Sequence, residues 1–150
     1  MARVVIALGS NLGDREAILD FAVSALSALP KTQLLRTAKR YETAPVDVPP
    51  AFENDCFLNS AVLLETSLLP HALLEALHHI EHQAGRIRTI RNGPRTLDLD
   101  IILYEGVTMN SAELTLPHPR AHLRAFVCIP LSDLGITIDA LKQNRIETGV

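Results

Sequence analysis

The stretch LDLDIILY at residues 97–104 alternates apolar and acidic side chains and then becomes wholly apolar. Successive side chains of a β-strand point to opposite faces, so Asp98 and Asp100 would share one face and the alternating leucines the other. The stretch therefore predicts a strand that buries its leucine face in the core. The two aspartates would stand about 7 Å apart at Cα, since a strand rises about 3.3 Å per residue.

Segments before and after this stretch supply the rest of a sheet and its helices. We predict strands at residues 4–8, 34–41 and 57–65, helices between Asp14 and Pro30 and at residues 70–85 and 121–131, an extended segment at residues 114–119, and a last helix near residues 138–142. The order strand–helix–strand, strand–helix–strand is typical of helices on one face of a mostly antiparallel sheet. The predicted fold class is α+β, a ferredoxin-like βαββαβ sandwich with long active-site loops at residues 43–55 and 86–94.

The composition fits one globular domain spanning residues 1–150. Of the 150 residues, 47% are hydrophobic and 21% charged, enough to bury a sizeable core. The formal net charge of -3 argues against a nucleic-acid partner. No apolar run could span a bilayer and the N-terminal residues lack a signal-peptide pattern, so we expect no membrane partner. Cys56 and Cys128 lack metal-ligand spacing and are expected to be reduced thiols, which favours a cytoplasmic protein.

Four arginines precede the aspartate stretch within a short segment: Arg86, Arg88, Arg91 and Arg95. Guanidinium groups pair with phosphate oxygens in a bidentate manner and stay charged at any relevant pH. The neighbouring carboxylates suit Mg²⁺, which is held by one or two carboxylates together with substrate phosphates. Positive and negative charge in one place is what phosphoryl transfer needs, because its catalysis is mostly positioning and charge stabilisation.

Other interpretations of these residues remain open from the sequence. An aspartate pair alone more often indicates a strand face exposed to solvent than a metal site. His78 and His82 are one helical turn apart, and we interpret them as part of an exposed helix face. A non-catalytic ferredoxin-like nucleotide-binding module is the main alternative to an enzyme. An RNA-binding domain would need stacking aromatic residues, and the strand at residues 97–104 offers only Tyr104.

The run RNGPRTLDLDII at residues 91–102 resembles the signature of the 6-hydroxymethyl-7,8-dihydropterin pyrophosphokinase family. Further stretches are similar to the same family: ALGSNLG at residues 7–13, YETAP at 41–45, FLNSAV at 57–62, Ile80-Glu81 with Gly85-Arg86, and LPHP at 116–119 with Arg124 and Phe126. Together they extend to about Leu131. Asn92 stands where some members have a tryptophan.

The resemblance implies transfer of a pyrophosphoryl group from ATP to the hydroxymethyl group of the pterin, with release of AMP. Asp98 and Asp100 would bind two Mg²⁺ ions, and Arg86 and Arg95 would act with them as catalytic residues. The implied ATP-binding residues are Glu81, Arg86, Arg88, Arg95, Ile101, Thr115, His118 and Arg124. The implied pterin-binding residues are Thr43, Pro45, Val46, Phe57, Asn59 and Phe126. The only partners expected are these small molecules, with the chain acting as a monomer.

The residues themselves agree in part with these implied roles. Asn59 is a polar residue in an apolar strand, and a buried amide needs hydrogen-bond partners that a pterin could supply. Phe57 and Phe126 have flat rings that could stack on either side of a ligand, although the sequence alone favours simple core packing for them. The turn at residues 9–13 lacks the lysine of a P-loop, so we interpret it as a tight turn that shapes the pterin side.

Overall fold

The computed structural model describes residues 1–11, 14–43, 56–86, 97–119 and 125–137, and residues 140 and 143. The side chains of Arg86 and of residues 125–128 are outside this description. The elements are β1 (Ala2–Ser10), α1 (Arg15–Ser27), β2 (Thr32–Thr37), β3 (Tyr41–Thr43), β4 (Phe57–Thr66), α2 (Pro70–Arg86), β5 (Asp98–Tyr104), β6 (Met109–Asn110), β7 (Thr115–Leu116) and α3 (Ala125–Asp133). Within the described residues, no helix is both long and apolar enough to cross a membrane.

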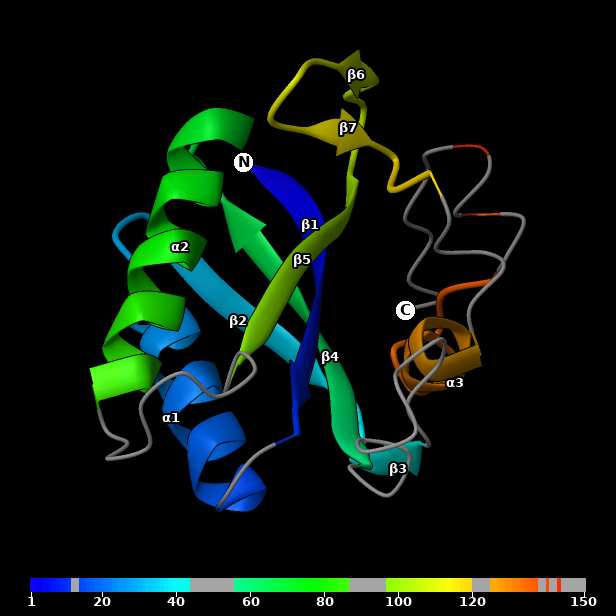
Figure 1. The fold of residues 1–150 in the computed structure, drawn as a ribbon. Coiled ribbons are helices and arrows are strands. Elements are labelled where there is room, and N and C mark those ends of the chain that lie inside the picture. The colour runs from blue at the N-terminus through cyan, green and yellow to red at the C-terminus, as the bar shows by residue number, and fades with distance from the viewer. Residues whose placement is uncertain are drawn as a thin grey trace.

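The main sheet has the strand order β2-β4-β1-β5, with β3 also paired to β4. Every pairing is antiparallel, and β1 lies between β4 and β5. Helices α1 and α2 lie on one face of this sheet, and the hairpin β6–β7 extends beyond the end of β5 (Figure 1). The predicted α+β fold with βαββαβ order is confirmed.

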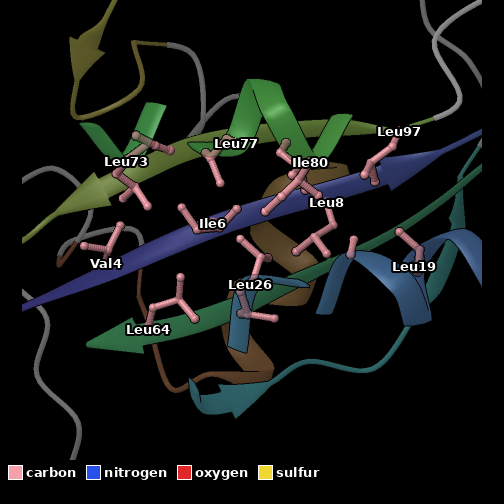
Figure 2. Packing of buried hydrophobic residues seen from close by; sticks show 14 of the residues in the cluster. Val4, Ile6, Leu8, Leu19, Leu26, Leu64, Leu73, Leu77, Ile80 and Leu97 are labelled. Atoms are coloured by element: carbon pink, nitrogen blue, oxygen red, sulfur yellow. The ribbon is translucent and has the colours of Figure 1, made fainter. Parts of the chain in front are cut away.

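The larger hydrophobic core lies between the sheet and helices α1 and α2. The even-numbered residues of β1 point into it, as strand geometry requires. Figure 2 shows side chains of α2 and α1 directed at this face of β1; the labelled ones are Leu73, Leu77 and Ile80 from α2 and Leu19 and Leu26 from α1. Their spacing of three to seven residues puts each set on one side of its helix, as the sequence predicted.

A second, smaller core lies on the opposite face of the sheet. Val5, Leu63 and Leu103 pack there with Leu131 and Leu134 from α3 and the residues after it. Helix α3 therefore covers part of the second face (Figure 1). The expectation that all helices lie on one face is wrong in this respect, because α3 is apolar enough to bury itself against a second apolar surface.

Two boundaries differ from the sequence prediction. The single strand expected at residues 34–41 is divided into β2 and β3, and between them the Ala38 amide donates to the Ala61 carbonyl at 2.8 Å. The extended segment at 114–119 contains β7, whose two-residue partner β6 carries too little sequence signal to predict. Asp14 caps the first helix, since its Oδ1 accepts from the Ala17 amide at 3.0 Å.

Candidate active site

The aspartate pair lies on the open face of β5, as its alternation predicted. Leu99 and Ile101 are buried on the helix side of the sheet, whereas Asp98 is half-buried and Asp100 is exposed. On the neighbouring strand β1, the partner of Asp98 is Gly9 and the partner of Asp100 is Ala7. Neither register partner therefore places a large side chain beside the two carboxylates.

Gly9 also faces Asn59 on its other side, so one row runs across the sheet from Asn59 through Gly9 to Asp98. Strands lie about 4.8 Å apart, so the amide and the carboxylate are about 10 Å apart at their backbones. A Cβ at Gly9 would lie 3.0 Å from Asn59 Oδ1 and 3.7 Å from Phe57 Cδ1. Only glycine fits between these groups without displacing one of them.

The Asn59 amide is held in a defined orientation at this end of the row. Its side chain is 5% exposed, and Nδ2 donates to Thr43 Oγ1 on β3. Thr43 is the register partner of Phe57, which is half-buried. The structure therefore brings together three of the residues predicted to bind the pterin.

A pocket of about 290 Å³ lies on the other side of the aspartates, between α2, β5 and the β6–β7 hairpin. Its lining includes Asp100 and four residues predicted to bind ATP: Glu81, Ile101, Thr115 and His118. His78 on α2 also lines the pocket and was missed as a site residue. Its exposed helix position was predicted, but the hairpin that faces it gave no signal in the sequence.

Two hydrogen bonds fix the pocket to the aspartate strand. Glu81 Oε2 accepts from the Leu99 amide at 2.9 Å, at the residue between the two aspartates. The His118 amide donates to the Ile102 carbonyl at 2.9 Å. The β5 backbone is thus held by α2 and by the segment after β7.

The donor set suits a hard divalent cation. Asp98 and Asp100 offer only carboxylate oxygens, and they project from one face of a rigid strand. Among the residues that the structure describes, no group of three or more histidine, cysteine, aspartate or glutamate side chains could form a complete cage. This arrangement fits Mg²⁺, which usually takes its remaining ligands from water and substrate phosphates.

A family model described as 7,8-dihydro-6-hydroxymethylpterin-pyrophosphokinase, HPPK, matches residues 5–136. The chain belongs to this family. The prediction of a diphosphotransferase enzyme is thereby confirmed, and the paired aspartates lie within the matched part of the chain.

Curated relatives agree with this family. The chain is 41% identical over 135 residues to a 2-amino-4-hydroxy-6-hydroxymethyldihydropteridine pyrophosphokinase of Methylorubrum extorquens, covering 90% of this chain and 84% of that protein. It is 44% identical over 130 residues to the Bacillus subtilis protein of the same name, covering 86% and 75%. A mitochondrial folate synthesis bifunctional protein of Pisum sativum is 48% identical over 140 residues, and the match spans 91% of this chain but 26% of the pea protein.

Solved structures show the same fold. A crystal structure of Plasmodium falciparum HPPK-DHPS superposes with a TM-score of 0.68 at 15% sequence identity. The match covers 95% of this chain and 45% of that chain, so the present chain spans less than half of the Plasmodium protein.

Several of the site residues predicted from the HPPK resemblance lie outside the part of the chain that the structure describes. For others, the structure describes the backbone but not the side chain. These are Pro45, Val46, Arg86, Arg88, Arg95, Arg124 and Phe126. Arg86 is the last residue of α2 and Phe126 belongs to α3, but neither side chain is described. Their roles remain predictions.

A contact beside Asn59 joins α3 to the sheet. Tyr41 is the register partner of Asn59, and its hydroxyl donates to Asp133 Oδ2 at 2.6 Å. The Lys39 amide donates to the same oxygen at 3.0 Å. The hydrogen bond from Tyr41, followed by that from Lys39, lowers the pKa of Asp133, and the bond to Asp133 raises the pKa of Tyr41. This contact fixes the end of α3 beside the row of site residues.

Proposed function

We propose that this chain transfers pyrophosphate from Mg-ATP to the hydroxymethyl group of 6-hydroxymethyl-7,8-dihydropterin in folate biosynthesis. The products are AMP and the pterin diphosphate. The observation that carries the proposal is the row Asn59–Gly9–Asp98, which joins an amide-lined end to the carboxylate pair beside the α2–β5 pocket. Both co-substrates would thus meet at one edge of the sheet.

The amide-lined end fits a flat heterocycle with donors and acceptors. Asn59 would pair with the amide edge of the pterin, since Thr43 holds its Nδ2 and orients the group. Phe57 would cover one face of the ring, and Phe126 the other. Pro45 and Val46 complete the pterin set that we propose by resemblance.

The pocket end fits the nucleotide. Glu81, Ile101, Thr115 and His118 line it. We propose that the triphosphate extends from this pocket over Asp100 toward the row. Arg86, Arg88, Arg95 and Arg124 would neutralise its phosphates, because guanidinium groups bind phosphate oxygens as bidentate donors.

The carboxylate pair would hold two Mg²⁺ ions. When bound, the metal ions neutralise phosphate charge and make the pterin hydroxyl a better nucleophile. Asp98 and Asp100 contribute by fixing the position of negative charge on a strand that Glu81 and His118 hold in place.

The chemical step is an in-line displacement. The pterin hydroxyl oxygen bonds to the β-phosphorus of ATP while the bond from that phosphorus to the oxygen bridging to the α-phosphate breaks. AMP leaves with the bridging oxygen, and the hydroxyl proton passes to solvent. Arg86 and Arg95 would stabilise the charge on the transferred group, so no covalent enzyme intermediate is required.

The remaining parts of the proposal concern the whole chain. We propose a single domain over residues 1–150 that acts as a monomer on small molecules. We also propose a cytoplasmic location, which agrees with the free thiol of Cys56 because thiols stay reduced there.

An assay for AMP tests this function. The full chain is incubated with Mg-ATP and the reduced pterin, and AMP is measured with and without the pterin. We expect AMP to form only when the pterin is present. ATP binding without any AMP would instead favour the non-catalytic nucleotide-binding module.

A further inference from the structure

Arg15 bridges two segments that are far apart in the sequence. It is the first residue of α1, directly after the Asp14 cap. Its Nη1 donates to the Cys56 carbonyl at 2.8 Å, and its Nη2 forms an ion pair with Glu42 Oε1 at 2.5 Å. The side chain of Arg15 is 28% exposed, whereas that of Glu42 is 60% exposed.

The two partners of Arg15 directly precede residues of the pterin end. Glu42 comes before Thr43, and Cys56 comes before Phe57. Thr43 and Phe57 are register partners in the β3–β4 pair. The guanidinium of Arg15 therefore contacts the residues that directly precede Thr43 and Phe57.

This end of the β3–β4 pair depends on such a contact because β3 has only three residues. Short strands are marginal on their own and their ends open easily. If the ladder opens there, Thr43 Oγ1 moves away from Asn59 Nδ2, and the amide loses the bond that orients it. Arg15 opposes this movement with two bonds, one of them charge-assisted on both sides.

We propose that Arg15 is a positioning residue for the pterin end of the active site. It acts by holding the Thr43–Phe57 pair in register, and it does not itself touch the pterin. The inference rests on the proposed function, because the pterin is taken as the ligand of Asn59. The nucleotide pocket lies across the sheet at β5 and α2, so binding of ATP should be independent of Arg15.

Arg40, directly before β3, provides a matched control because it is also linked to α1 by ion pairs. It forms ion pairs with Glu16 and Asp20 of α1, and it precedes the other end of β3. That end has additional support, because Tyr41 and the Lys39 amide both bond to Asp133. Loss of Arg40 therefore removes a comparable helix–strand link without releasing Thr43.

The test compares four variants in steady-state kinetics and in fluorescence titration with 6-hydroxymethyl-7,8-dihydropterin. We expect Arg15→Ala to raise the KM and Kd for the pterin about tenfold, with kcat and the KM for ATP within about twofold of wild type. Arg15→Lys and Glu42→Gln each keep one of the two contacts, so their pterin constants should rise about threefold. Arg40→Ala should leave the pterin constants within about twofold, even where it lowers Tm as much as Arg15→Ala does.

Hydrogen exchange gives a readout that needs no ligand. In Arg15→Ala, the backbone amides of Thr43 and Phe57 should exchange faster than in Arg40→Ala. Unchanged pterin constants in Arg15→Ala would overturn the inference, as would an equal rise in the KM for ATP. If Arg15→Ala does not fold, the same criteria apply to Arg15→Lys and Glu42→Gln. A wild-type chain that forms no AMP and binds no pterin refutes the proposed function, whereas an active wild type with unaffected Arg15 variants refutes only this inference.

Discussion

At the scale of single residues, the site depends on small side chains as much as on charged ones. Gly9 lies between Asn59 and Asp98, and Ala7 lies beside Asp100. Neither small residue carries chemistry. Each instead keeps a large side chain from standing beside the carboxylate or amide of its register partner.

Gly9→Ala should weaken pterin binding. The new Cβ would lie 3.0 Å from Asn59 Oδ1, so the amide must move from the orientation that Thr43 imposes. We expect the KM for the pterin to rise about tenfold and the stability to fall by about 1–3 kcal/mol, measured by steady-state kinetics and urea unfolding. Gly85→Ala is the control, because nothing lies within 4 Å of a Cβ there. An unchanged KM in Gly9→Ala would show that the Asn59 amide is not a pterin contact.

Asp98→Asn and Asp100→Asn should each lower kcat about a thousandfold while the fold survives. Asparagine keeps the shape of the side chain and removes the charge that a cation requires. Glu105→Gln, just beyond the other end of β5, should retain wild-type turnover. Circular dichroism checks the fold and AMP release measures turnover. Wild-type rates in both aspartate variants would disprove their assignment as metal ligands.

Sequence pattern and family resemblance pointed to residues of β5, β4 and β3 that the structure places near one another in the sheet. Period-two alternation put Asp98 and Asp100 on one face, and the polar Asn59 stood out in an apolar strand. The long-range contacts that support these residues could not be predicted from the sequence. The bonds of Arg15 span 27 and 41 residues, and no local pattern encodes contacts at such separations.

At the scale of elements, helix α2 stabilises the strand that bears the aspartates. Strand β5 ends the order β2-β4-β1-β5, so one of its sides has no strand neighbour in that order. The Glu81 carboxylate accepts the Leu99 amide proton on that side. A carboxylate placed this way satisfies a backbone donor and also discourages pairing with another strand.

Glu81→Ala should therefore reduce both stability and nucleotide binding. Loss of the acceptor leaves the Leu99 amide without this partner, and we expect Tm to fall by about 4 °C. Glu81→Gln retains an oxygen that can accept from Leu99, so its Tm should stay close to wild type. Differential scanning calorimetry of the two variants makes the comparison. Equal losses of Tm in both would show that charge, and not the hydrogen bond, stabilises this region.

Helix α3 is attached to the sheet through a contact that depends on pH. The pKa of Asp133 is lowered from its ordinary 3.8, so its stabilising effect is complete above that value and is lost as the pH falls through the lowered pKa. The pKa of Tyr41 is raised from 10.0, so its effect is complete below that value and is lost as the pH rises through the raised pKa.

Tyr41→Phe should consequently lower stability by a constant amount between about pH 5 and 8, and by less in strong acid. Urea unfolding of wild type and variant across this range measures the difference. A difference that persists undiminished at the lowest pH would mean that Asp133 does not contribute as an acceptor from Tyr41.

At the scale of the whole molecule, the sheet has a hydrophobic core on each face, and the two cores differ in size. The larger core under α1 and α2 makes the fold stable, and α3 covers only part of the other face. Element order and hydrophobic spacing were enough to predict the first core. The second core could not be predicted, because a short apolar helix does not reveal which surface it covers.

The central claim is that ATP donates its terminal pyrophosphoryl group intact to a pterin alcohol at this edge of the sheet. The most direct measurement follows ATP labelled at the β-phosphorus through a single turnover with the reduced pterin. We expect the label to appear in a pterin diphosphate, with one AMP released for each, and we expect Asp98→Asn to form neither product. Release of ADP, or label that never leaves the nucleotide in the wild-type reaction, would contradict it.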